Sequence, residues 1–188
     1  MPSPIGHSLS GVLLYSLLEK PSHPFRPWQK LLPYLLIANL PDIDFMVYRA
    51  GRVRFVEDYH HAYSHSLGFG LVAALITYGV LWAFREKERF RYVLLAVGLT
   101  AVHCFLDLTN WTGQLFSPGG LPLLWPFGQQ TFACPILILP GVATGKSPFD
   151  PVNLIGISSE FLLFGSSIAL VWAYRAKRHD AGTMPNTV

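Results

Sequence analysis

Long apolar segments separated by short polar stretches run through most of the chain. Residues 66–84 contain no charged side chain, residues 92–110 are polar only near their end, and residues 153–174 carry a single charge, Glu160. A helix that crosses a bilayer needs about 20 mainly apolar residues. The pattern therefore predicts three membrane-spanning helices.

Two earlier apolar segments are shorter or interrupted. Residues 7–19 form the first, and residues 31–48 form the second, which contains Pro41, Asp42 and Asp44. A helix can be broken at membrane depth where the break lines a polar cavity inside the protein. We therefore predict an all-α, polytopic membrane bundle of about four to five membrane-embedded helices, with the two aspartates facing such a cavity.

The remaining segments are polar or irregular. Residues 111–151 are rich in proline, glycine and aromatic side chains and have no helical period. Loops of this length are commonly functional, and their aromatic residues are typical of the membrane interface. We expect residues 1–175 to form a single domain and residues 176–188 to be a polar, disordered tail.

Composition supports a membrane protein. The chain is 51% hydrophobic and only 13% charged, whereas soluble domains carry about 25% charged residues. The net charge of +3 is small and its basic residues are spread over short loops. We therefore predict that the partner is the lipid bilayer and that the chain does not bind nucleic acid.

Lysine and arginine are distributed unevenly among the loops. If residues 85–91 and 175–178 are cytoplasmic, and the first two segments both cross, four of the 14 basic residues fall outside: Arg49, Arg52, Arg54 and Lys146. This bias predicts the orientation. It also puts the outer ends of the apolar segments next to most of the histidines and aspartates.

Those polar side chains have the spacing of metal ligands. His103 and Asp107 are four residues apart on one helix face, with Asn110 a further turn along, and His61 and His65 share the same spacing. Imidazole and carboxylate are the ordinary ligands of Zn²⁺. We predict one metal site at one end of the bundle, with these ligands: His7, Asp42, Asp44, His61, His65, His103, Asp107 and Glu160.

This set is larger than a structural zinc site needs. Four ligands close such a site, whereas this chain offers about eight, so we expect two or three divalent ions and a catalytic role with metal-activated water. Asp44 or His60 is the expected proton acceptor.

Three motifs resemble a known family: Asn39-Leu-Pro-Asp-Ile-Asp44, His61-x-x-Ser-His-Ser66 and His103-x-x-Leu-Asp-x-x-Asn110. They are similar to the signatures of the YdjM/YbcI-like inner-membrane metal-dependent hydrolases, and His7 fits that pattern. The resemblance covers residues 1 to about 175. It implies a multi-pass protein of the bacterial inner (cytoplasmic) membrane, with the site on the extracytoplasmic side by the charge bias above.

The family in turn is distantly similar to zinc-dependent phospholipase C and P1-type nucleases, helical enzymes with a trinuclear zinc site. His7, Asp42 or Asp44, His61 or His65, His103, Asp107 and Glu160 match the order of their ligands. The similarity implies hydrolysis of a phosphoester, with a lipid among the candidate substrates.

Other interpretations of these residues stay open. His103 and Asp107 can form a packing pair, Asp42 and Asp44 can cap a helix, and Glu160 can be a protonated group or a proton relay. The chain can accordingly be a metal or proton carrier, although the inner halves of the long spans hold almost no ionisable group. Ala62 replaces a basic residue usual in the family, which favours a third alternative, a non-catalytic metal-binding scaffold.

Overall fold

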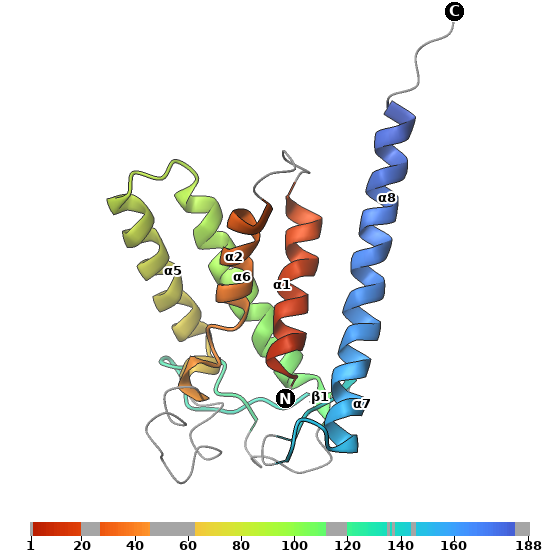
Figure 1. The fold of residues 1–188 in the computed structure, drawn as a ribbon. Coiled ribbons are helices and arrows are strands. Elements are labelled where there is room, and N and C mark those ends of the chain that lie inside the picture. The colour runs from red at the N-terminus through yellow and green to blue at the C-terminus, as the bar shows by residue number, and fades with distance from the viewer. Residues whose placement is uncertain are drawn as a thin grey trace, which may run out of the picture.

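The structure is a computed structural model that describes residues 2–19, 27–45, 63–111, 120–134, 136, 138–143 and 146–182. These residues are mostly helical (Figure 1). The helices are α1 (Pro4–Leu18), α2 (Pro27–Ala38), α5 (Leu67–Ala83), α6 (Arg89–Leu108), α7 (Pro151–Glu160) and α8 (Ser166–Gly182). Shorter elements are a 3₁₀ turn (Tyr63–His65), a π-helical turn (Phe161–Gly165) that joins α7 to α8, β1 (Asn110–Trp111) and β2 (Leu139–Pro140).

Polar side chains fix where the helices begin. Ser3 accepts a hydrogen bond from the N–H of Gly6 at the start of α1, and Ser66 accepts one from the N–H of Phe69 at the start of α5. Asp150 does the same for α7 through Val152. Each caps a backbone donor that has no partner within the helix. The three caps lie at the same end of the bundle, where the polar motifs also lie (Figure 1).

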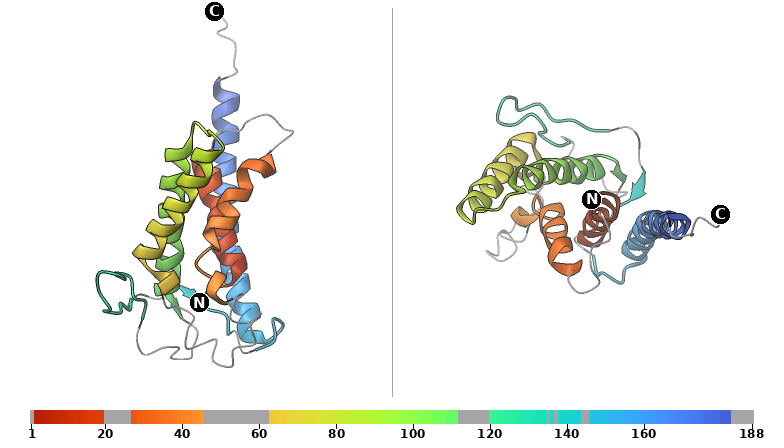
Figure 2. Two further views of the ribbon diagram at one scale, coloured as in Figure 1. Left: turned by 90° about the vertical axis from the view of Figure 1, so that its left-hand side faces the viewer. Right: turned by 90° about the horizontal axis from the view of Figure 1, so that it is seen from above.

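The helices lie side by side with their axes roughly aligned, and successive helices alternate in chain direction (Figures 1 and 2). In Figure 2, α5 lies at one side of the bundle and α8 at the other, with α1, α2 and α6 between them. α1 packs closely on α2 at Gly11, which has no side chain. A Cβ at this position would come within 2.9 Å of the Tyr34 carbonyl oxygen. Small residues allow such close approach of helices in membrane proteins.

The buried core is small and divided in two. One cluster consists of Tyr34, Ala38, Leu95 and Leu99, and joins α2 to α6. The second consists of Leu106, Leu139 and Phe164, and joins α6 to β2 and the π-helical turn. β2 pairs in parallel with β1, which directly follows α6. The second cluster therefore holds the predicted irregular loop against the end of α6.

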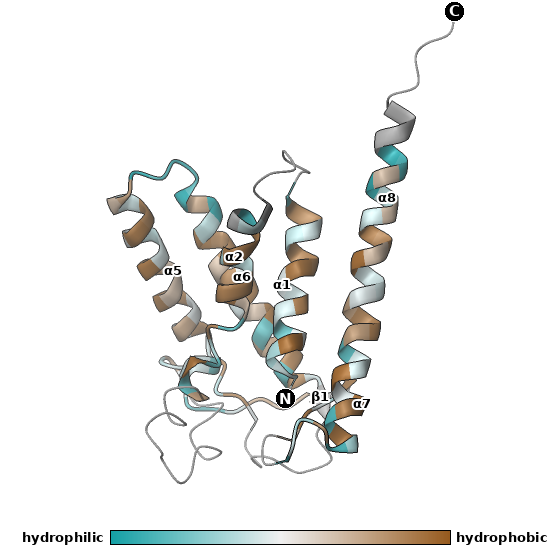
Figure 3. Cartoon of the chain, viewed as in Figure 1, coloured by the Kyte–Doolittle hydropathy of each residue, from teal (hydrophilic) through white to brown (hydrophobic). Residues whose placement is uncertain are grey.

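Many large apolar side chains on the helices are exposed, and Figure 3 shows that hydrophobic residues occur along most of the helices. Leu75, Leu162 and Leu170 are each at least 70% exposed. Apolar surface of this extent needs a covering partner. Within the described residues, two helices are long and apolar enough to cross a membrane, Arg89–Leu108 and Pro151–Arg178, while Pro4–Leu18 and Leu67–Ala83 are apolar but shorter.

Two helices end at other residues than the apolar segments from which they were predicted. The second apolar segment ends as a helix at Ala38, before Pro41, so Asp42 lies in the turn that follows α2 and Asp44 in the helical residues 43–45 after it. At the other end of the chain, α8 continues to Gly182, past residue 175 where the sequence predicts the end of the domain. That boundary and the single-domain organisation stay predictions.

Candidate metal centre

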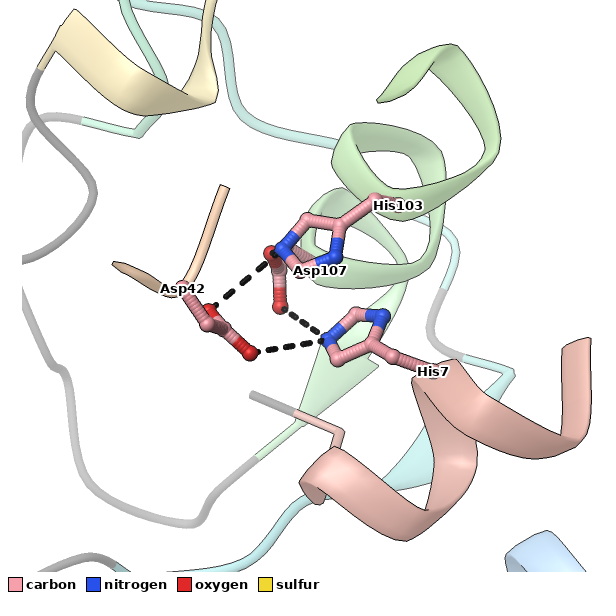
Figure 4. Close-up of side chains that lie close together, drawn as sticks. All are labelled: His7, Asp42, His103 and Asp107. Carbon is pink, nitrogen blue, oxygen red and sulfur yellow. Dashed lines mark ion pairs between the residues drawn. The ribbon is translucent and has the colours of Figure 1, made fainter. Parts of the chain in front are cut away.

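Four side chains from three separate segments meet at one end of the bundle. His7 comes from the first turns of α1, Asp42 from the turn after α2, and His103 and Asp107 from the last two turns of α6. One ligand atom from each of the four lies within 4.8 Å of the others (Figure 4). Such a group of imidazole nitrogens and carboxylate oxygens could hold a metal ion.

The cluster is shielded from solvent. His7 is 0% exposed, His103 1% and Asp42 7%, and the side chain of Asp107 is 1% exposed. Burying ionised carboxylates requires compensating positive charge or a bound cation. Histidines are the compensating groups in the contacts described below.

The two carboxylates each use their two oxygens toward different histidines. Asp107 directs Oδ1 toward His7 Nε2 at 3.6 Å and Oδ2 toward His103 Nε2 at 3.1 Å. Asp42 directs Oδ2 toward His7 Nε2 at 3.9 Å and Oδ1 toward His103 Nε2 at 3.4 Å. The same two acids thus lie between His7 on one side and His103 on the other.

His65 joins the His103 side. Its Nε2 lies 3.2 Å from Asp107 Oδ2, 3.5 Å from Asp42 Oδ1 and 3.2 Å from His103 Nε2. The 3₁₀ turn that precedes α5 brings His65 to this point, and its side chain is fully buried. His65 and His103 therefore face the same pair of carboxylate oxygens.

Hydrogen bonds on the far side of the rings orient two of these imidazoles. His103 Nδ1 donates to the Ala38 carbonyl oxygen at 2.7 Å. His65 Nδ1 lies 3.0 Å from Ser64 Oγ, which donates to Asp44 Oδ2 at 2.6 Å. A proton held on Nδ1 leaves the lone pair on Nε2, which is the arrangement typical of metal-bound histidine.

His7 has a different environment. Neither of its ring nitrogens has a hydrogen-bond partner among the described residues, although both are buried. Its ring stacks on that of His103, with centroids 3.6 Å apart. Two charged imidazoles at that distance would repel each other. A buried imidazole without a hydrogen bond is suited to ligate a cation.

The pKa shifts of Asp42 and His65, which lie outside the α-helices, agree with this arrangement. Burial opposes the charged form of Asp42, but hydrogen bonds from His103 and His65 outweigh it and hold its pKa well below the ordinary value. Burial likewise opposes a charge on His65, yet Asp107 and Asp42 raise its pKa above the ordinary value. The site thus favours ionised carboxylates facing a positive charge.

Comparison with known proteins adds the family. The model of the YdjM inner membrane protein family matches residues 1–179, nearly the whole chain. This chain belongs to the YdjM family. No curated protein and no solved structure matches it. Membership supports association of the apolar helices with a lipid bilayer, and it confirms the family predicted from the three motifs.

In this YdjM-family chain, Glu160 does not join the histidines. Its buried carboxylate accepts a hydrogen bond from the backbone N–H of Ser3 at 2.6 Å and another from the Ser3 hydroxyl. It also packs against Gly6, where a Cβ would come within 2.6 Å of the carboxyl carbon. The structure thus places Glu160 beside the start of α1, the helix that carries His7, but outside the four-residue cluster.

Asp44 also lies outside the four-residue cluster, and its Oδ2 is 4.0 Å from His65 Nδ1, the ring nitrogen on the far side from Asp42 and Asp107. His60 and His61 fall outside the described residues. Asn110 begins β1. The structure therefore brings together His7, Asp42, His65, His103 and Asp107 from the predicted set.

Two contributors were not predicted. Ser3 binds Glu160 through its hydroxyl and N–H, and the Ala38 carbonyl oxygen orients His103. A serine followed by proline at the start of an apolar segment is a helix-start signal, so Ser3 was identifiable as a cap but not as the partner of a residue 157 positions away. A backbone carbonyl carries no sequence signal.

Proposed function

We propose that the YdjM-family cluster binds two divalent cations, with Asp42 and Asp107 bridging them. The observation that carries this proposal is the division of the carboxylate oxygens. Asp42 Oδ2 and Asp107 Oδ1 face His7, while Asp42 Oδ1 and Asp107 Oδ2 face His65 and His103. The first position then has three protein ligands and the second has four.

The donors fit zinc. Imidazole nitrogen and carboxylate oxygen are its usual ligands, and an incomplete ligand shell is typical of catalytic zinc. Asp44, through Ser64, and the Ala38 carbonyl oxygen would hold the second position's histidines in the metal-binding tautomer. Zinc at this site would supply Lewis acidity toward a phosphoryl oxygen and an activated water.

We propose that the reaction is hydrolysis of a phosphoester, with a lipid phosphoester as a candidate substrate. The residues themselves would bind the cations, keep their charge balanced and exclude bulk water, since His65 and the four side chains of the cluster are buried or nearly so. Asp44 or His60 would accept the proton from water. The resemblance to zinc-dependent phospholipases and P1-type nucleases supports this reaction class.

We further propose that α1, α2, α5, α6 and the α7–α8 helix are embedded in the inner membrane, with the metal centre on the extracytoplasmic side. The opposite end of the bundle carries an excess of basic residues. Among the described residues, those at that end are Lys30, Arg85, Lys87, Arg89, Arg91, Arg175, Lys177 and Arg178. Basic residues concentrate on the cytoplasmic side of membrane proteins.

The decisive experiment is metal analysis of the detergent-purified full chain, followed by activity on a phosphoester panel. We expect two equivalents of zinc, and their loss in His103→Ala and Asp107→Ala. Cys104→Ala is the matched control, because Cys104 is buried beside His103 on the same helix but belongs to no part of the cluster. Activity should vanish on chelation and return with zinc.

Two results would overturn the proposal. A folded wild type that takes up no divalent cation would remove the metal centre. A zinc-loaded protein without turnover on phospholipid, nucleotide and aryl phosphoesters would remove the hydrolase, leaving the binding site in place. Zinc flux into proteoliposomes without turnover would favour the carrier.

A further inference from the structure

A cavity lies between α1, α2 and α6, and it extends from their basic end toward the metal centre. It has a volume of about 800 Å³, within the range of ligand-binding cavities. Its walls are apolar and consist mainly of Leu14, Leu18, Leu94, Leu95, Leu99 and Val102. Tyr34 and Leu99, which are almost fully buried, form its floor.

The cavity has the length of a lipid chain within one leaflet. It extends along α6 from Arg91 to Val102, a distance of about 17 Å at the helical rise of 1.5 Å per residue. Half of a bilayer's hydrocarbon core is about 15 Å thick. The cavity therefore reaches from the basic end of the bundle to about the depth where an acyl chain would end.

The end of the cavity near Arg91 is polar, and its charged lining residues are Lys30, Arg91 and Glu19. Arg91 is half-exposed and pairs with Glu19 and, at 2.9 Å, with Glu88. The hydroxyl of Tyr34 also donates to Glu19, at 2.8 Å. Lys30 is exposed and forms no ion pair with any described residue. With the Glu19 carboxylate engaged by its neighbours, Lys30 is free to meet an anion.

We infer that this cavity binds an anionic phospholipid of the cytoplasmic leaflet, with one acyl chain along the α6 wall and the phosphate beside Lys30. A basic side chain at the surface and an apolar channel beneath it match the two parts of such a lipid. The inference rests on the membrane placement proposed above. It does not depend on metal binding or hydrolysis, because none of the four residues of the metal cluster lines the cavity.

Gly98 allows the cavity to be filled selectively. It lines the cavity, and a Cβ built on it meets no atom within 4 Å. Gly98→Phe should therefore place its ring in the cavity without a backbone clash. Gly79 on α5 is a matched control, because it is also an exposed helical glycine with open space around its Cβ but does not line the cavity.

The test is lipid binding to the delipidated full chain in detergent. Phosphatidylglycerol and phosphatidylcholine with identical acyl chains are titrated separately, and the lipids retained per protein are counted by native mass spectrometry. We expect the wild type and Gly79→Phe to retain one phosphatidylglycerol in preference to phosphatidylcholine. Gly98→Phe should lose this lipid, and Lys30→Gln should bind it about fivefold more weakly, as expected for removing one lysine from an anionic contact.

Equal retention of the two lipids by the wild type would overturn the inference, as would unchanged lipid binding in Gly98→Phe. Zinc content measured on the same samples separates this result from the proposed function. Gly98→Phe should keep the metal of the wild type, which also shows that it is folded. Lys30→Gln changes an exposed side chain and provides a test that does not depend on filling the cavity.

Discussion

The buried carboxylate of Glu160 holds Ser3, the residue that caps α1, through both its backbone N–H and its hydroxyl. This contact ties the last long helix of the chain to the first turn of the first helix. His7 lies one turn further along α1, with both ring nitrogens buried and Nε2 facing the carboxylates of the metal cluster. The position of His7 therefore depends on a residue that is not itself in the cluster.

We predict that Glu160→Gln destabilises the protein and weakens zinc binding without removing a ligand. The amide replaces one acceptor oxygen with a donor, which leaves a buried Ser3 group poorly paired at about 1–3 kcal/mol. Denaturant unfolding in detergent gives the stability, and a zinc titration gives the affinity. Glu86→Gln in the exposed turn after α5 is the control and should match the wild type. Unchanged unfolding and zinc affinity in Glu160→Gln would contradict the link.

We predict a stronger effect from Gly6→Ala. A Cβ at this position would lie 2.6–2.9 Å from the Glu160 carboxyl atoms, so either the carboxylate must move away from Ser3 or α1 must shift and carry His7 with it. The matched variant is Gly79→Ala, where the space is open. Alanine in an exposed helix is favoured over glycine by about 0.5–1 kcal/mol, so this control should be slightly more stable. If Gly6→Ala and Gly79→Ala unfold at the same denaturant concentration, the close contact between Gly6 and Glu160 is contradicted.

We predict that Ser64→Ala weakens zinc binding by about 10–100-fold while the stoichiometry at saturating zinc stays unchanged, as is usual when a group that orients a metal ligand is lost. Ser64 Oγ links His65 Nδ1 to Asp44, so its removal breaks this link to the ring. A competition titration against a zinc chelator measures the affinity. Ser159→Ala, on the exposed face of α7, is the control. Equal affinities would assign Ser64 no part in the site.

How much of the site could be predicted depends on how far apart in the sequence the contacting residues lie. The four-residue spacing of His103 and Asp107 fixed their shared helix face in advance, and their closeness in the structure agrees with it. His7, Asp42 and His65 could be assigned to the same end from charge bias and segment ends. Spacing could not distinguish Asp42 from Asp44, because which of the two acids after α2 faces inward depends on the tertiary contacts of that segment.

The fold was predictable to a similar degree. The apolar segments at residues 66–84, 92–110 and 153–174 correspond closely to α5, α6 and the α7–α8 helix. Of these, only α6 and α7–α8 meet the length and hydropathy of a membrane span among the described residues. The partner of Glu160 and the cavity beside α6 could not be predicted, because both depend on which helices become neighbours.

The sidedness of the metal centre gives the last prediction, for which the chain supplies its own probes. Cys134 is partly exposed in the loop that packs at the metal end, where Leu67 N–H donates to the Leu123 carbonyl oxygen, while Cys104 is buried in α6. A membrane-impermeant thiol reagent added to intact spheroplasts should label the wild type but not Cys134→Ser. In that cysteine-depleted background, Lys177→Cys at the basic end of α8 should react only after permeabilisation. Labelling in the reverse order would place the metal centre in the cytoplasm and exclude an extracytoplasmic substrate.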